Sequence, residues 1–469
     1  MSAKTKNIIK YSVFTILAFL ILAGLLKVLS SKETTGGYMN SLTQLSNTPK
    51  DTIDVAFVGS SHCFAGIEPC ILWDEYGISA FDMSVSGQDK DSAIHCIKEL
   101  CKTQSPKVVM VDMYALSYDK HGVEGNIYRN YLSLKPSANS IQLVQDFYDN
   151  DLKKDLLFRF PIVHTRYREL DMYDFRRYRF NSYARGEEIP VYTHTPAEIV
   201  YENYEITEAT PLSTKNEKWL LELYELSQKE NFELILMVIP FQFESELQML
   251  FNGAKEFADE YGITYINYTD YADEMRLDGM QDFFDATHLN TYGAKKLTSF
   301  IGSHTLSDMN LPDHRGDSSY NLWAVDSYMI SRYEKIDEFK YNYDIYRYFE
   351  ILSEINDLYV VVSLEHDYDN PENNYLNMLS PLGIDSNEFK EGGKWVFENG
   401  KCQKVCENKE GDFFVKEFKN GDTIRVGYTD EMAEDNFIFN YDPVMPTGYN
   451  GTVFIYDTIN EEVIDCRGF

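Results

Sequence analysis

The sequence is poor in positive charge. Its 469 residues include 43 Lys and Arg against 75 Asp and Glu, a formal net charge of −32. Nucleic acids and anionic lipids repel a polyanion, so this charge argues against either as a direct partner. The surplus of acidic side chains is typical of a soluble surface; a surface that binds cations or a basic polymer is the alternative.

The sequence also lacks the patterns of a disulfide-rich or zinc-binding protein. Seven cysteines are an odd number in a long chain, which argues against a disulfide framework. Cys402 and Cys406 lie four apart, but no histidine or further cysteine pair stands beside them at zinc spacing. We interpret the cysteines as thiols, with one candidate bridge between Cys402 or Cys406 and Cys466. The histidines show no metal-ligand spacing either, so we expect no metal and no cofactor.

Only one hydrophobic run is long enough to cross a membrane. Residues Ile8–Leu29 are mostly apolar, with Lys10 and Lys27 near the ends. At about 1.5 Å per residue, this run can span a hydrocarbon core of about 30 Å. A cleaved signal peptide is the competing interpretation, but no convincing small-x-small cleavage site follows.

The lysines before this run favour a cytoplasmic N-terminus. We therefore predict a cytoplasmic tail at 1–7, a transmembrane anchor at 8–30 and a polar linker at 31–50. The protein would be a single-pass protein of the cell membrane, with the bulk of the chain outside the cytoplasm.

After the linker, short apolar runs alternate with helical patterns. Continuous apolar runs are typical of strands buried on both faces of a parallel sheet, and strand–helix alternation indicates an α/β domain with right-handed crossovers. We place this domain at 51–310, with the Tyr- and Arg-rich segment 119–208 as an insertion over the sheet's active edge. The predicted strands are 53–58, 79–85, 107–111, 232–239 and 264–268; the predicted helices are 72–76, 91–102, 216–229, 244–261 and 291–301.

The C-terminal part has a different character. Residues 311–345 read as a connector, and the stretch 328–355 is rich in helix formers and aromatics. From Leu358 onward, short β-type runs are separated by Asn, Gly and Asp turns, which predicts a separate β-rich domain at 346–469.

Three reactive side chains fall where strands of the α/β domain end. Ser61 follows the first strand, while Asp285 and His288 precede the last helix. Ligands of open parallel sheets bind beyond the carboxyl ends of the strands, so these groups can converge there. A serine hydroxyl needs a base, and the base needs an orienting acid, which the D-x-x-H spacing provides. Asp282 is an alternative orienting acid.

Gly87 follows the second strand and offers a backbone N–H without a side chain in the way. With the N–H of Ser61 it could hold a developing oxyanion, a contribution of about 3 kcal/mol per donor.

The motifs VGSSH and DFFDATHLNTYGAKKL, in this order, resemble the SGNH/GDSL hydrolase superfamily, and most closely its membrane-anchored bacterial cell-envelope branch. The resemblance covers about 51–303. It implies a flavodoxin-like parallel sheet, with Ser61 as nucleophile, His288 as base and Asp285 as its partner. It also implies Gly87 as an oxyanion donor.

The sequence departs from the family pattern at two places. Ser60 stands where G-D-S has its Asp, and VDMYAL replaces the G-x-N-D block after the third strand. The missing Asn donor would be replaced by the Tyr114 hydroxyl or the Asp112 backbone. This departure fits a transferase-like or slow member better than a fast esterase. His62 is a candidate substrate contact or a structural residue, and Asn290 is expected to cap the last helix.

The C-terminal domain resembles the interleukin-like EMT-inducer domain, through LYVVVSLE at 358–365 and the ending GTVFIYDTINEEVIDCRGF. Where that domain has Arg-Gly-Leu-Asn, residues 447–450 read Thr-Gly-Tyr-Asn. The resemblance implies no catalytic residues, and carbohydrate binding and a spacer role both stay open.

Two functions follow. The first is an SGNH-type serine esterase or O-acyltransferase acting on acyl groups of a cell-surface polysaccharide or teichoic-type polymer, with a membrane-bound O-acyltransferase as a partner that the resemblance alone suggests. The alternative is a non-catalytic glycan-binding surface protein on an SGNH scaffold.

Overall fold

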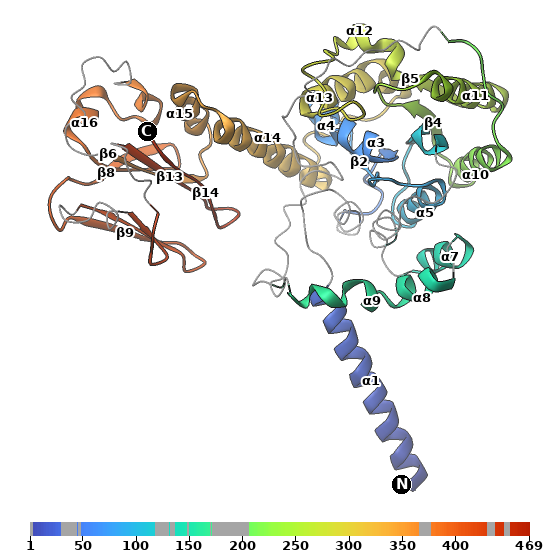
Figure 1. Ribbon diagram of the computed structural model, residues 1–469, viewed down its shortest axis with the longest axis horizontal. Helices are drawn as coiled ribbons and strands as arrows, with labels where there is room; N and C mark the ends of the chain where they lie inside the picture. Colours follow the sequence, from blue (N-terminus) through green and yellow to red (C-terminus); the bar gives the residue numbers. More distant parts are fainter. Residues whose placement is uncertain are drawn as a thin grey trace. The chain divides into compact units, whose positions relative to one another are not determined.

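The computed structural model divides the chain into two compact units, Met1–Ile330 and Ser331–Phe469 (Figure 1). The structure describes residues 3–29, 45, 48–117, 131, 137–147, 150–168, 170, 206–364, 377–428, 437–444 and 451–469. Most of the predicted linker, and the motif at 447–450, lie outside the described residues.

The first unit begins with α1 (Ala3–Leu29), a helix of 27 residues. Its residues Lys4–Leu29 are long and apolar enough to cross a membrane, and no other helix in the described part of the chain meets that test. Its large side chains are exposed, with Phe14 at 72%. This agrees with the predicted span by length and composition.

A five-stranded sheet forms the centre of the first unit. It consists of β1 (Val55–Val58), β2 (Ala80–Asp82), β3 (Val108–Asp112), β4 (Glu233–Val238) and β5 (Thr264–Asn267). The order is β2-β1-β3-β4-β5, and every neighbouring pair is parallel. The predicted parallel sheet is therefore confirmed.

Helices cover both faces of this sheet (Figure 1). Alternate residues of a strand point to opposite faces. Ala56 and Val58 of β1 accordingly pack in one core with α5, α10 and α11, and Val55 and Phe57 pack in another with α3, α4 and α13. The helices that the structure describes in this unit are α3 (Ser61–Gly66), α4 (Pro69–Tyr76), α5 (Lys90–Leu100), α7 (Ala138–Phe147), α8 (Asn150–Phe158), α9 (Phe160–Val163), α10 (Thr214–Glu230), α11 (Ser245–Tyr261), α12 (Ala272–Met275) and α13 (Thr291–Phe300). Shorter turns of helix are η1 (Met113–Ser117), η2 (His164–Arg168), η4 (Tyr268–Tyr271), η5 (Ile301–Leu306), η6 (Ser307–Met309) and η7 (Ser318–Tyr320).

The second strand is shorter than predicted, ending at Asp82 instead of Val85. The chain nevertheless continues beside β1. Met83 N–H donates to the Phe57 carbonyl at 2.7 Å, and Val85 N–H donates to the Gly59 carbonyl at 3.1 Å. The exit of β2 thus follows the exit of β1.

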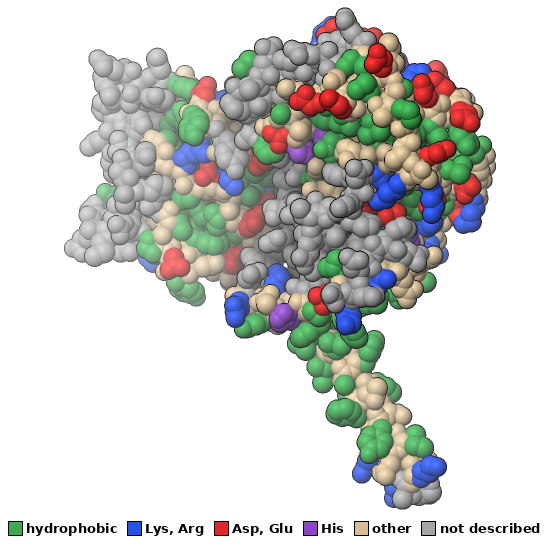
Figure 2. Space-filling model, turned by 45° about the vertical axis from the view of Figure 1, so that its right-hand side comes forward, with side chains coloured by type: hydrophobic (Ala, Val, Ile, Leu, Met, Phe, Trp, Pro, Cys, Tyr) green, Lys and Arg blue, Asp and Glu red, His purple; other side chains and the backbone are tan. Residues whose placement is uncertain are grey.

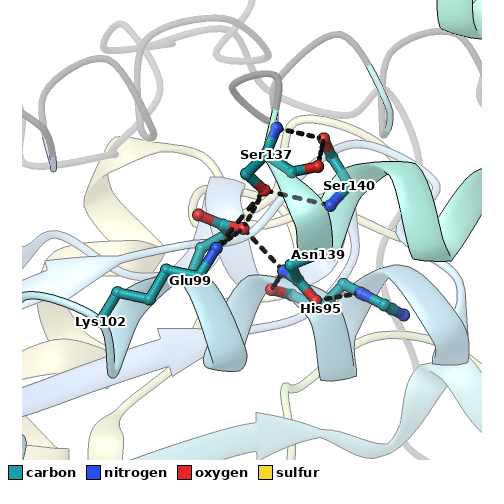
Figure 3. A network of polar contacts seen from close by, with 6 residues as sticks. All are labelled: His95, Glu99, Lys102, Ser137, Asn139 and Ser140. Atoms are coloured by element: carbon teal, nitrogen blue, oxygen red, sulfur yellow. Dashed lines mark hydrogen bonds and ion pairs between the residues drawn. The ribbon is translucent and has the colours of Figure 1, made fainter.

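Most of the described residues of the segment 119–208 are helical, at 138–147, 150–158 and 160–168. A polar network joins the start of α7 to α5 (Figure 3). The Glu99 carboxylate accepts hydrogen bonds from Ser137 Oγ at 2.8 Å and Asn139 Nδ2 at 2.7 Å, and Lys102 Nζ lies 2.5 Å from it. Asn139 also bonds both the ring and the carbonyl of His95. These bonds attach α7 to the helical layer of the sheet.

The second unit contains two antiparallel sheets, as its β-type runs predict. In the described residues their orders are β14-β13-β6-β7-β8 and β12-β11-β10-β9. Buried side chains of both sheets share one core, including Val361 and Phe454 of the first and Ile424 and Val426 of the second. The strands are β6 (Leu358–Leu364), β7 (Gly393–Glu398), β8 (Lys401–Cys406), β9 (Phe413–Glu417), β10 (Thr423–Gly427), β11 (Phe437–Phe439), β12 (Asp442–Pro443), β13 (Gly451–Asp457) and β14 (Glu462–Gly468).

The other face of the larger sheet packs against helices. Phe339 from the end of α14 (Asn321–Tyr341) and Phe349 from α15 (Ile345–Ser353) lie in the core beneath it. The turn η9 (Ser380–Leu382) and α16 (Ser386–Glu391) complete the described helices of this unit.

The candidate disulfide to Cys466 was wrong, because all seven cysteines are free. Cys402 and Cys406 lie on β8, and Cys466 lies on β14, the opposite edge strand of the same sheet. Strands are spaced about 4.8 Å apart, so three intervening strands separate the thiols far beyond the roughly 7 Å between Cα atoms that a disulfide can bridge.

Candidate active site

Ser61 lies at the sharp turn between β1 and α3. It is the first residue of α3, three residues beyond the end of β1. Gly59 makes this turn possible, since a Cβ there would lie 2.7 Å from the Cβ atoms of both Asp112 and Cys63. Ser60 caps α3 through its side chain and donates from Oγ to Asp112 Oδ2 at 3.4 Å. Ser61, by contrast, is partly exposed at the sheet's carboxyl edge.

His288 and Asp285 lie in a tight hairpin loop before α13. Phe283 and Leu289 form an isolated antiparallel bridge, and both side chains are buried in the core below. The Phe284 N–H donates to the His288 carbonyl at 3.0 Å. The loop is therefore closed by its own backbone and anchored at both ends.

The loop orients the imidazole of His288. Asp285 Oδ1 accepts the backbone N–H groups of Thr287 at 2.8 Å and His288 at 2.9 Å. The same carboxylate lies 2.9 Å (Oδ1) and 3.0 Å (Oδ2) from His288 Nδ1. Donation from Nδ1–H to a carboxylate leaves the other nitrogen free to accept a proton.

That second nitrogen faces the serine. His288 Nε2 lies 2.8 Å from Ser61 Oγ, although 227 residues separate them in sequence. The structure thus brings Ser61, His288 and Asp285 into one hydrogen-bonded line. Partial burial raises the pKa of Asp285, but the bonds from Thr287 and the charge of His288 outweigh it and lower the pKa overall. The carboxylate is therefore ionised at neutral pH.

Asp282, the alternative orienting acid, has another task. Its buried carboxylate lies 2.5 Å from Lys296 Nζ and accepts the Asp278 N–H at 2.6 Å. Asn290 caps α13, as predicted, by accepting the N–H groups of Tyr292 and Gly293.

His62 is buried next to this line. Its ring stacks on Tyr114 with centroids 3.9 Å apart and meets Phe241 edge-on at 4.3 Å. The His288 ring lies 5.1 Å away. Burial, followed by the charge of His288, lowers the pKa of His62 to about 3, so its imidazole is neutral. The Tyr114 ring, which stands after β3, is thereby held against the residue that follows the serine.

Gly87 lies in the turn after β2. The Gln88 N–H donates to the Val85 carbonyl at 2.8 Å, and Gly87 has φ +64°. This left-handed conformation favours glycine. Because the Val85 N–H binds the Gly59 carbonyl, the turn adjoins the Ser61 turn.

The sequence did not predict a role for two buried carboxyl groups beside the serine turn. Asp82 ends β2 and Asp112 ends β3, on either side of β1. Burial raises the pKa of each carboxyl group to about 7. Hydrogen bonds from Ser84 to Asp82, and from Tyr114 and Ser60 to Asp112, lower the pKa and offset part of this rise. Their position at strand ends was the available signal, because such residues share one edge of a parallel sheet.

The sequence also did not predict a role for Thr287. Its hydroxyl lies 2.9 Å from both Asp285 Oδ1 and His288 Nδ1.

Among the described residues, no group of three or more His, Cys, Asp or Glu side chains could hold a metal ion.

The first unit is thus an α/β protein with a Ser–His–Asp line at the carboxyl edge of a parallel sheet. No family model matches the sequence, and no curated protein matches it. Among solved structures, the chain is similar to a crystal structure from Bacteroides fragilis that is provisionally described as an acylhydrolase. The identity is 11%, the TM-score is 0.28, and the match covers 56% of this chain and 92% of that chain. A similarity of this size does not indicate a function.

Proposed function

We propose that the chain is a membrane-anchored serine esterase or O-acyltransferase of the SGNH type, acting outside the cytoplasm on acyl groups of a cell-surface polysaccharide or teichoic-type polymer. The observation that carries the proposal is the unbroken line from Ser61 Oγ through His288 to Asp285. A hydroxyl, an imidazole and a carboxylate in hydrogen-bond reach are what nucleophilic acyl transfer requires.

The geometry supports a two-step reaction. Ser61 Oγ attacks the carbonyl carbon of an acyl ester while His288 Nε2 takes its proton, and Asp285 stabilises the resulting imidazolium. The tetrahedral intermediate collapses when His288 returns the proton to the leaving alcohol. A sugar hydroxyl or water then attacks the acyl-enzyme, with His288 again as base. The bond to Ser61 Oγ breaks, His288 returns the proton to Oγ, and the acylated sugar or the free acid leaves. The N–H groups of Ser61 and Gly87 are the proposed oxyanion donors.

Two features support the finer assignments. The order β2-β1-β3-β4-β5 is the flavodoxin-like order, whose ligand site lies at the switch point between β1 and β3, where Ser61 and Asp112 stand. The helix α1 would tether the catalytic unit to the membrane surface, with its N-terminus in the cytoplasm. An acyl donor made by a membrane-bound O-acyltransferase would then be within reach.

The test uses the full chain reconstituted in lipid nanodiscs. We expect it to hydrolyse p-nitrophenyl acetate and to form a covalent adduct with a fluorophosphonate probe. Ser61→Ala should abolish both. Ser303→Ala is the matched control, because its hydroxyl is exposed on η5 and bonds only neighbouring carbonyls of the same helical segment. Equal turnover and labelling of wild type and Ser61→Ala would overturn the assignment of the nucleophile.

Glycan binding without catalysis is the second candidate, and a cavity in the second unit favours it. The cavity has a volume of about 320 Å³. Polar and aromatic side chains line it, among them Asn399, Asn420, Phe418 and Tyr456. Binding of cell-wall polysaccharide that survives Ser61→Ala, together with the absence of any fluorophosphonate adduct in wild type, would favour this candidate over the enzyme.

A further inference from the structure

The segment 150–168, which forms α8, α9 and η2, reverses the charge of the chain. It contains five Lys and Arg residues and two Asp residues, a formal net charge of +3 in a chain of −32. The basic residues are Lys153, Lys154, Arg159, Arg166 and Arg168. The net negative charge of the chain argues against binding to anionic lipids, but that argument does not apply to this positively charged segment.

The same segment exposes aromatic side chains. Leu156 and Val163 point inward and are buried. Phe158 and Tyr167 are 68% and 59% exposed, and Leu157 and Phe160 are exposed as well. Figure 2 shows hydrophobic and basic side chains gathered at the base of the first unit, over these short helices. Apolar rings interleaved with basic side chains are typical of elements that lie in the headgroup layer of a bilayer.

A break between α8 and α9 determines which aromatic side chains of the segment are exposed. Arg159 has φ +54°, a left-handed conformation that ends α8 and starts α9. Its guanidinium lies 4.8 Å from the centre of the Tyr131 ring. Phe158 and Phe160, on either side of the break, are consequently both exposed.

The segment also lies at the end of the hydrophobic helix. Both α9 and η2 contact α1. Arg166 Nη1 lies 3.5 Å from the carbonyl of Val28, at the C-terminal end of α1. The other end of the segment leads through α7 to the network on α5, so the segment joins the anchor to the catalytic unit.

We infer that the segment 150–168 lies in the headgroup layer of the membrane that α1 crosses, with its exposed rings at the acyl-chain boundary and the exposed Lys154 and Arg168 on anionic lipid phosphates. This inference rests on the membrane anchoring in the proposed function. A lipid surface is the occupant because the exposed rings and the basic charge stand at the C-terminal end of α1.

Brominated lipids test the inference, because they quench tryptophan fluorescence on contact. The four native tryptophans, at positions 73, 219, 323 and 395, are all buried and supply a background that the unsubstituted protein measures. Single substitutions in the full chain would add a tryptophan at Phe14 in α1, at Phe158 in the segment, or at Met280. Met280 is 47% exposed between α12 and α13, which lie on the side of the unit opposite α8 and α9 (Figure 1).

In nanodiscs of brominated phosphatidylcholine and phosphatidylglycerol, we expect the lipids to quench the fluorescence that Phe14→Trp and Phe158→Trp add. The fluorescence that Met280→Trp adds should be unchanged. Loss for Phe14→Trp alone would overturn the inference and leave the anchoring intact. No loss at either position would overturn the anchoring and the inference together. Turnover of p-nitrophenyl acetate by each variant reports that the catalytic unit is folded.

The electrostatic part has its own test. Quenching of Phe158→Trp should weaken in nanodiscs of phosphatidylcholine alone, and should weaken with added salt in mixed nanodiscs. Quenching that depends on neither would overturn the role of anionic lipid.

Discussion

Ser60 Oγ donates a hydrogen bond to Asp112 Oδ2, 3.4 Å away, so the turn that carries the nucleophile is attached to the end of the neighbouring strand. Asp112 also accepts the Tyr114 N–H at 3.3 Å through its other oxygen. One buried carboxyl group therefore connects the Ser61 turn after β1 with the Tyr114 loop after β3. Tyr114 in turn stacks on His62, which follows Ser61.

Asp112→Ala should impair the position of Ser61. It removes the acceptor for Ser60 and Tyr114, and a buried donor left unpaired costs about 1–3 kcal/mol. We expect a lower kcat with KM for p-nitrophenyl acetate little changed, and a lower unfolding temperature. Asp112→Asn keeps an acceptor oxygen and should recover most of kcat. Equal kinetics for the Asn and Ala variants would contradict this positioning role.

The variants Asp285→Asn and Asp282→Asn should distinguish the acid that orients His288 from the acid that pairs with Lys296. Asparagine at 285 no longer stabilises the imidazolium of His288, so kcat should fall by roughly 10³-fold or more with the fold unchanged. Asparagine at 282 leaves Lys296 without its buried partner, so the unfolding temperature should fall while the kcat of the folded protein stays within a few-fold. Steady-state kinetics and calorimetry on both variants make the comparison; a reversed pattern would make Asp282 the orienting acid.

The buried carboxyl of Asp82 should make stability depend on pH. Burial raises its pKa from 3.8 to about 7, so between these values the folded state holds a proton that the unfolded state has lost. Stability therefore falls as pH rises through this window, by up to about 1.4 kcal/mol per pH unit, and the dependence ends above pH 7. Asp82→Asn keeps the acceptor for the Ser84 N–H and removes the titration.

Urea unfolding of wild type and Asp82→Asn over this range gives the measurement. The variant should gain stability relative to wild type as pH rises. A difference between the two proteins that does not change with pH would show that Asp82 does not titrate in this window.

Arg332→Ala should strongly destabilise the second unit. The guanidinium is 2% exposed and forms two bonds to the buried Asp457 at 2.9 and 2.8 Å, and one to Asp357 at 2.7 Å. Removal leaves the buried carboxylate of Asp457 without its cation, at a cost of about 3–5 kcal/mol. Arg347→Ala is the matched control, because Arg347 pairs with Glu338 and Glu350 at the surface, where solvent and salt screen the charges and the pairs contribute little. Similar unfolding temperatures for the two variants would contradict the distinction.

The elements of the first unit could be predicted because their signals are local. The apolar run of β3 and the helical period of α5 identify those elements without knowledge of their neighbours. The meeting of Ser61 with the Asp285 and His288 loop could also be expected, from their positions at strand ends and from the motif resemblance. Other contacts between distant segments left no comparable signal. The bond from Ser60 to Asp112 depends on β1 and β3 being neighbours, and the choice of Asp285 over Asp282 depends on where Lys296 lies. The wrong disulfide had the same origin, because spacing alone does not show that Cys466 lies at the far edge of a sheet.

The hairpin around Thr287 has a consequence for how activity can be lost or controlled. Its acid and its base are preassembled within four consecutive residues, by bonds that the backbone and Thr287 supply. The 2.8 Å contact between His288 Nε2 and Ser61 Oγ joins this preassembled pair to its nucleophile. If the proposed reaction takes place here, a displacement of the hairpin by about 1 Å would break this bond and could lower the rate about 10²-fold, although neither partner would itself be altered.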